Sequence, residues 1–183
     1  MKTKELTLVA MMTSLTVILA QLSIPIGSVP ITFAILSVYL NGALLGRKLG
    51  TISIILYILL GAIGLPVFAN FSGGIHVLFG PTGGYLFGWI IATFVIGAGF
   101  KFGKSNLNTD YFLFIVLSFV GLVVIYLLGV IQLKYVLDLT WAKAYAAGIA
   151  PFILLDVLKI IFAGIIVIPV RSALIKSKLL LQN

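Results

Sequence analysis

Charged residues are too scarce in this chain to cover the surface of a water-soluble protein. Of its 183 residues, 62% are apolar and only 9% are charged. A soluble domain of this size carries roughly a quarter of its residues as charged side chains. The composition therefore predicts a membrane protein. It excludes soluble enzymes and nucleic-acid-binding proteins, in spite of a formal net charge of +8.

Six apolar stretches are candidates for membrane spans. They cover residues 6–24, 31–45, 49–63, 83–100, 111–133 and 147–170. A helix needs about 20 mostly apolar residues to cross the hydrocarbon core. The second and third stretches are short, and Arg47 and Lys48 separate them because such charges do not stay unpaired at mid-bilayer. We expect an all-α membrane protein, a bundle of six transmembrane helices that forms a single integral domain over residues 1–183.

The distribution of Lys and Arg supports an even number of spans. With six spans, nine of the twelve basic residues fall on one side, namely Lys2, Lys4, Arg47, Lys48, Lys101, Lys104, Arg171, Lys176 and Lys178. Basic residues collect in the loops that stay in the cytoplasm. An odd number of helices would divide these charges between the two faces. We therefore predict a multi-pass protein of the cytoplasmic membrane with both termini in the cytoplasm.

Two ionisable residues, Asp156 and Lys159, lie inside the last apolar stretch. Three residues apart on a helix, they point to the same face and can pair. An ionisable group in a span costs about 2.5–3.5 kcal/mol on insertion scales and usually faces a cavity or a partner. We expect Pro151 in the first turn of this helix, which places the pair one to two turns below the non-cytoplasmic surface.

The connection between the third and fourth stretches predicts an irregular loop rich in glycine and proline. Residues 64–85 contain six glycines and two prolines, yet they are also apolar and aromatic. Irregular backbone at membrane depth is tolerated where it is buried or lines a cavity. The polar side chains of this segment are Asn70, Ser72, His76, Thr82 and Tyr85. Together with the intramembrane pair, they favour a small-molecule site over a turn that only caps the bundle.

The sequence offers no pattern for catalysis or for a resident metal. It has no cysteine and one histidine, His76, which excludes a thiolate zinc site and an iron–sulfur cluster. No residues with catalytic spacing surround His76, so we expect no catalytic residues, no metal and no cofactor. Two other interpretations stay open. One is a membrane-embedded enzyme that uses His76 and Asp156, and the other is a helical scaffold in which Asp156 and Lys159 only pair.

Several segments resemble the BioY family, the biotin-specific S components of energy-coupling factor (ECF) vitamin transporters. The matching segments are 24–32 (IPIGSVPIT), 46–50 (GRKLG), 61–68 (GAIGLPVF), 80–88 (GPTGGYLFG), 151–152 (PF) and 156–159 (DVLK). They cover about five of the six apolar stretches. The fifth stretch is not diagnostic.

The resemblance implies a six-helix bundle that binds biotin in a pocket open to the outside and is not itself an enzyme. A transmembrane coupling protein and two cytoplasmic ATPases, which hydrolyse the ATP, are the implied partners. Lys159 would neutralise the biotin carboxylate, and Asp156 and Asn70 would bind polar groups of the ligand, such as the ureido ring. Gly73, Gly74 and Tyr85 would line the pocket. An S component for another vitamin is the nearest alternative.

S components are similar in carrying Ala-x-x-x-Ala on the first helix, where the coupling protein docks. The matching positions here are Ala10 and Ser14. Spacing alone favours packing within the bundle, because small residues let helices approach closely. A second departure is Ala34, where the resemblance leads us to expect glutamine. The loop from Pro25 to Pro30 is expected to cover the entrance of the pocket.

Overall fold

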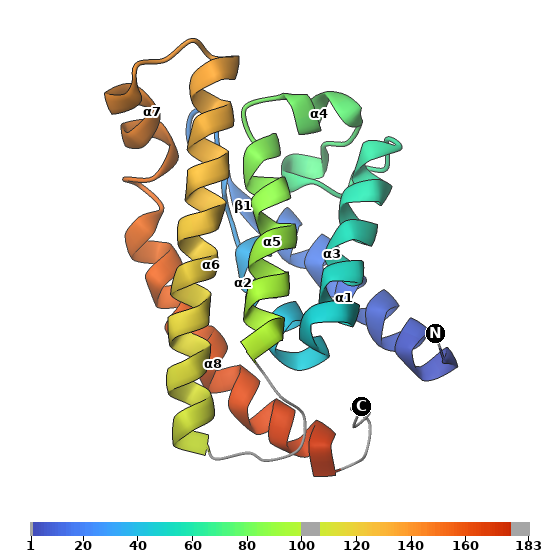
Figure 1. The fold of residues 1–183 in the computed structure, drawn as a ribbon. Coiled ribbons are helices and arrows are strands. Elements are labelled where there is room, and N and C mark those ends of the chain that lie inside the picture. Colours follow the sequence, from blue (N-terminus) through green and yellow to red (C-terminus); the bar gives the residue numbers. More distant parts are fainter. Residues whose placement is uncertain (1, 100–106, 177–183) are drawn as a thin grey trace.

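The computed structural model describes residues 2–99 and 107–176, and helices dominate it (Figure 1). The elements in chain order are α1 (Thr3–Gln21), β1 (Ser23–Ile24), β2 (Ile31–Thr32), α2 (Ala34–Leu40), the π-helix η1 (Asn41–Leu45), α3 (Gly46–Ala62), the 3₁₀ turn η2 (Ala69–Phe71), α4 (Ile75–Phe79), α5 (Gly83–Gly99), α6 (Leu107–Val136), α7 (Trp141–Gly148) and α8 (Ile153–Lys176). The predicted all-α class is thus confirmed in that the described residues are mostly helical, with one two-residue strand pair added.

The first helix ends earlier than predicted, because the chain turns into a short antiparallel ribbon. Ser23 pairs with Thr32, and Ile24 pairs with Ile31. Ile24 precedes Pro25, and a residue before proline is disfavoured in the helical conformation. Helix α1 therefore stops at Gln21 instead of reaching residue 24. The residues between the two strands, 25–30, form the loop of this ribbon.

A tight turn at Gly46 separates the second and third predicted stretches. Gly46 has φ 74° and ψ −178°, a conformation that side-chain-bearing residues rarely adopt. A Cβ on Gly50 would overlap the Asn41 carbonyl, although residues nine apart on a continuous helix would be about 13.5 Å apart. The segment α2–η1 therefore folds back against α3, as predicted for the charged junction at Arg47 and Lys48.

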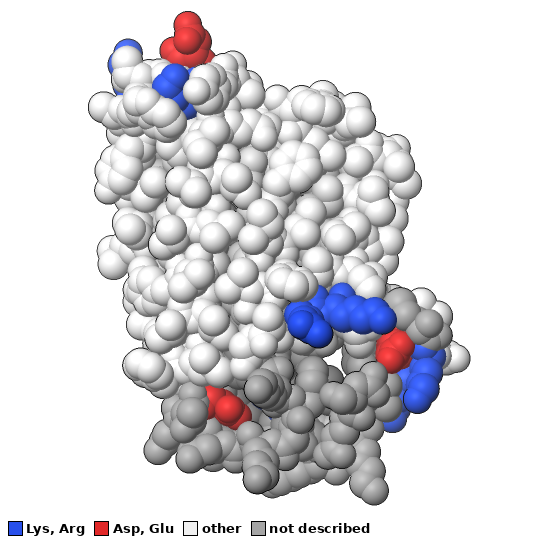
Figure 2. Space-filling model, in the orientation of Figure 1, with Lys and Arg blue, Asp and Glu red and all other residues white. Residues whose placement is uncertain are grey.

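Four helical stretches within the described residues are long and apolar enough to cross a membrane: Thr3–Gln21, Ala34–Ala62, Asp110–Val136 and Ile153–Leu174. The second of these contains the turn at Gly46, and α5 is apolar but shorter, with 17 residues. On the face drawn in Figure 2, charged side chains lie at the two ends of the molecule and leave an uncharged belt between them. This distribution is typical of a protein that spans a bilayer.

Two connections differ from the prediction, the one between α3 and α5 and the one between α6 and α8. Residues 63–82 contain η2 and the short helix α4, so this segment is less irregular than its glycines suggested. Helix α7 was not predicted; its residues were divided between a loop and the last stretch. Pro151 lies in the turn before α8 and not in the first helical turn, because α8 begins at Ile153.

Arg171, counted among the loop charges, lies within helix α8 and not in a loop. Helix α8 continues to Lys176, and Arg171 is only 3% exposed. Its Nη1 donates to the Ala43 carbonyl of η1 at 2.9 Å. The guanidinium therefore ties α8 to η1 inside the bundle. Lys101, Lys104 and Lys178, also part of the charge argument, lie outside the described residues.

We expect Gly88→Leu to destabilise the bundle, because α5 and α6 pack closely at this point. A Cβ on Gly88 would lie 2.7 Å from the Ile125 Cα, so a larger side chain would force the helices apart. Overpacking of this kind costs about 1–3 kcal/mol, occasionally more. Thermal unfolding of the detergent-purified variant measures the loss. Ile91→Leu, at an exposed position of the same helix, is the control; equal melting temperatures would contradict the packing argument.

Candidate ligand site

A cavity of about 200 Å³ lies in the half of the bundle that carries the ribbon and α4. Its wall combines residues of helices α1 to α6 and α8 with the β1–β2 ribbon and the segment around η2. The polar lining residues are Thr32, Asn70, Ser72, Thr82, Asp156 and Lys159. The aromatic ones are Tyr57, Phe68, Tyr85, Trp89, Tyr126 and Phe152. A mostly apolar wall with a few placed polar groups is typical of a small-molecule site.

An aromatic cluster forms one wall of the cavity. The rings of Tyr57 and Trp89 stack with centroids 6.0 Å apart, and Phe68 meets Tyr57 edge-on at 5.5 Å. Phe68 fits here because Gly61 has no Cβ to occupy the space of its ring. Such a wall offers flat apolar surface to a ring system while it excludes water.

Asp156 and Lys159 form an ion pair at one side of the cavity, as the spacing predicted. Lys159 Nζ donates to Asp156 Oδ1 at 2.8 Å and to the Thr32 carbonyl at 2.8 Å. Tyr126 donates its hydroxyl proton to Asp156 Oδ2 at 2.7 Å. Asp156 and Lys159 are 5% and 8% exposed. An ammonium group has three N–H donors, and these two bonds use two of them.

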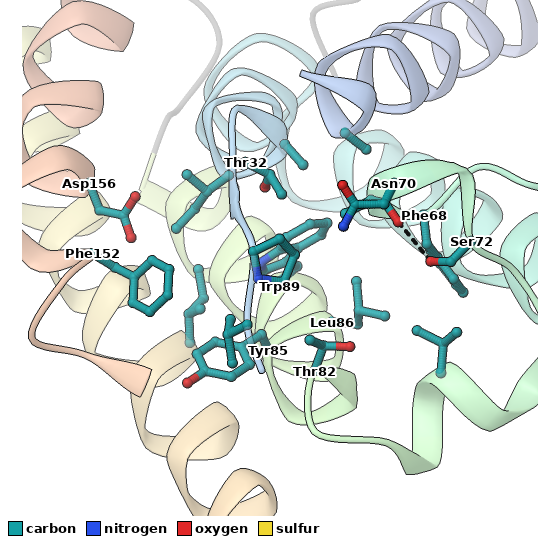
Figure 3. A pocket seen from close by; sticks show the side chains of 18 of the residues that line it. Thr32, Phe68, Asn70, Ser72, Thr82, Tyr85, Leu86, Trp89, Phe152 and Asp156 are labelled. Carbon is teal, nitrogen blue, oxygen red and sulfur yellow. Dashed lines mark hydrogen bonds between the residues drawn. The ribbon is translucent and has the colours of Figure 1, made fainter. Parts of the chain in front are cut away.

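Asn70 lies on the other side of the cavity from Asp156, with Trp89 and Tyr85 between them in Figure 3. It belongs to η2 and has left-handed backbone angles, φ 57° and ψ 35°. Ser23 donates its hydroxyl proton to Asn70 Oδ1 at 2.9 Å. The two polar ends and the apolar middle together suit an elongated ligand with one polar group at each end.

The other predicted site residues are placed differently. Tyr85 lines the cavity, but its hydroxyl donates to the Gly148 carbonyl at 2.9 Å, so the ring and not the hydroxyl faces a ligand. Gly73 and Gly74 lie outside the lining, and Gly74, with φ 103°, is the residue before helix α4. His76 is exposed on α4 and does not line the cavity, although its neighbour Val77 does.

Sequence reasoning missed several lining residues that come from apolar helices. Tyr57, Trp89 and Tyr126 are the clearest, and Tyr126 is the one that holds Asp156. A hydroxyl in the middle of a long apolar run was the available signal, since a buried tyrosine hydroxyl needs a partner. Ala34, the departure from the expected glutamine, also lines the cavity and is fully buried.

Ala10 and Ser14 face outward from α1. Both are exposed, whereas the buried side of the helix is formed by Val9, Thr13, Thr16 and Ala20. The spacing argument that favoured packing within the bundle is therefore wrong. The two small residues instead form an outward strip on the surface of α1.

Comparison with known proteins gives consistent results. Residues 1–176 match the BioY family. The biotin transporter BioY of Thermotoga maritima is 41% identical over 170 residues, which cover 92% of this chain and 96% of that protein. The probable biotin transporter BioY of Pyrococcus horikoshii is 46% identical over 166 residues, covering 91% and 95%. The crystal structure of the S-component for biotin from an ECF-type ABC transporter is similar with a TM-score of 0.83 and 32% identity, covering 93% of this chain and 92% of that one.

We expect Lys159→Met to cost about 3–5 kcal/mol of stability, because it leaves the Asp156 carboxylate buried without its counter-charge. The double variant Asp156→Asn with Lys159→Met removes both charges and should lose less than the sum of the two single losses. Thermal unfolding of the three ligand-free variants in detergent measures the coupling. Strictly additive losses would show that the two side chains do not stabilise each other.

Proposed function

Because this chain belongs to the BioY family, we propose that it is the biotin-binding S component of an ECF-type vitamin transporter. The observation that carries the proposal is the cavity, with the Asp156–Lys159 pair on one side, Asn70 on the other and aromatic rings between them. Biotin has the matching chemistry, a carboxylate at one end and a ureido ring at the other.

Lys159 binds the carboxylate of biotin in this proposal, using its remaining N–H donor, and Asp156 keeps the lysine in place. Asn70 binds the ureido group, and the wall formed by Tyr57 and Trp89 packs against the fused rings. Asp156 was first assigned to the ureido ring as well. Its position beside Lys159, with Oδ1 and Oδ2 both engaged, favours the supporting role instead.

The proposed membrane arrangement is a single domain with six crossings and both termini in the cytoplasm. The fold-back at Gly46 divides the long Ala34–Ala62 stretch into two passes, and α5 supplies a further short one. With α1, α6 and α8 this gives six. The exposed Arg47 and Lys48 then lie on the cytoplasmic side of the cytoplasmic membrane, in agreement with the positive-inside rule.

Transport in this proposal depends on a transmembrane coupling protein and two cytoplasmic ATPases, which supply the ATP hydrolysis, and the chain needs no cofactor of its own. The outward strip at Ala10 and Ser14 is the proposed docking surface for the coupling protein. Small residues there allow a partner helix to approach the backbone of α1 closely.

The alternatives are supported less well. An enzyme that uses His76 and Asp156 would need both in one site, but Asp156 lines the cavity and His76 does not. The relatives are named as transporters. A scaffold without ligand does not account for a lined cavity next to a buried ion pair. An S component for another vitamin shares the architecture, and competition with unlabelled biotin distinguishes it.

We expect the purified protein to bind biotin and Lys159→Ala to weaken that binding at least tenfold, about 1.4 kcal/mol or more. The affinity for biotin amide, which has no carboxylate, should change much less. Trp89 lines the cavity, so its fluorescence reports binding once Trp141, which is 57% exposed, is replaced by Phe.

Lys143→Ala, at an exposed position, is the control for the comparison of biotin with biotin amide. Equal losses for biotin and biotin amide would remove the carboxylate role from Lys159. A folded wild-type protein that binds no biotin would remove the proposed function itself.

We expect Ala10→Trp and Ser14→Trp to leave biotin binding intact but to abolish co-purification with the coupling protein and the ATPases. The positions are exposed, so the bundle tolerates the larger ring, whereas a closely docked helix does not. Phe162→Trp, at a 61% exposed position on α8, is the control. Normal assembly of both α1 variants would place the docking surface elsewhere.

A further inference from the structure

The turn that carries Asn70 has an unusual backbone. Asn70 and Phe71 both have positive φ, 57° and 54°, in immediate succession. Residues with a side chain rarely adopt this left-handed backbone conformation. It persists only where the surroundings impose it. The Phe71 side chain is 70% exposed, so its own packing does not impose the conformation. The restraint must come from elsewhere.

The side chain of Gln21, the last residue of α1, holds the turn on both sides. Its Nε2 donates to the carbonyls of Val67 and Phe68 at 3.1 and 3.2 Å. Its Oε1 accepts from the Phe71 backbone N–H at 2.9 Å. One carboxamide therefore satisfies three backbone groups around Asn70, and it does so from a helix that is distant in sequence.

A second contact, from strand β1 just after α1, orients the Asn70 carboxamide. Ser23 donates to Asn70 Oδ1 at 2.9 Å, which occupies the acceptor. The Nδ2 group is then the part of the side chain available to a ligand. A carboxamide presented in this way donates to a carbonyl oxygen, which is the acceptor of a ureido ring.

We propose that Gln21 is a positioning residue for ligand binding: it holds residues 67–71 in the conformation that directs Asn70 into the cavity. Gln21 does not line the cavity and acts only through the turn. The consequence for affinity rests on the proposed function, whereas the effect on the turn does not.

The first test uses the ligand-free protein. Gln21→Met keeps the length of the side chain and removes all three hydrogen bonds. Amide hydrogen exchange of the peptide that contains Phe68 to Ser72 should become at least tenfold faster. Thr13→Val, which removes the bond from the same helix to Ser53, is the control and should leave that peptide unchanged. Wild-type exchange in Gln21→Met would overturn the proposal.

The second test is a double-mutant cycle on biotin affinity, measured by calorimetry. Gln21→Met should weaken binding about tenfold, and Asn70→Ala should weaken it at least as much. The combined variant should bind no more weakly than Asn70→Ala alone, because Gln21 acts through Asn70. If the fold-losses in affinity of the two single variants multiply in the combined variant, Gln21 does not act through Asn70 and the proposal is overturned.

A further variant tests the two donated bonds. Gln21→Glu keeps the acceptor for the Phe71 N–H but turns a carboxylate oxygen toward the Val67 and Phe68 carbonyls in place of the donor, so its loss of affinity and its exchange rate should be at least as large as those of Gln21→Met. If the wild-type protein binds no biotin, the proposed function fails. The exchange experiment then still decides whether Gln21 holds the turn.

Discussion

A charged side chain inside this bundle needs a partner within the protein, because lipid offers none. The Asp156–Lys159 pair is the interaction on which most of the polar contacts around the cavity depend. Its hydrogen bonds reach Tyr126 on α6 and the Thr32 carbonyl on β2. The pair therefore fixes three parts of the chain relative to one another: the last helix, the longest helix and the ribbon that follows α1. In the proposed function, Lys159 both binds the carboxylate of the ligand and holds the fold together.

The opposite side of the cavity is held by neutral groups. Gln21 binds the backbone of the turn that contains Asn70. Gln132 on α6 donates to the carbonyls of Leu78 and Gly80, both at 2.8 Å. Side-chain carboxamides here replace the water that would hydrate these backbone carbonyls at a protein surface. The cavity thus has one wall fixed by charge and one fixed by amides, with packed aromatic rings between them.

Much of this could be predicted from the sequence, and the failures have physical causes. The apolar stretches, Asp156, Lys159 and Asn70 stand out because polarity is rare in a membrane chain. Trp89 does not, because an aromatic residue in an apolar run serves equally well toward lipid or toward a cavity. Tyr126 differs by its hydroxyl, which needs a partner, but the sequence alone does not show that this partner is Asp156. Arg171 was misplaced because a charge near a span end looks like a loop residue unless its partner, the Ala43 carbonyl, is known. Helix α7 mixes aromatic, small and basic residues and gives no clear period.

The difference in length between α5 and α6 has a consequence for depth. With 17 residues α5 rises about 25 Å, less than the roughly 30 Å of hydrocarbon, whereas its neighbour α6, with 30 residues, rises about 45 Å. In Figure 1, α6 extends beyond α5 at both ends, and α4 lies beside the start of α5. Helix α5 exposes Phe87, Ile91 and Phe94, so its surface meets the lipid directly. A span shorter than the hydrocarbon is matched by tilt or by local thinning of the bilayer, and we expect the lipid to be thinner beside α5 than beside α6.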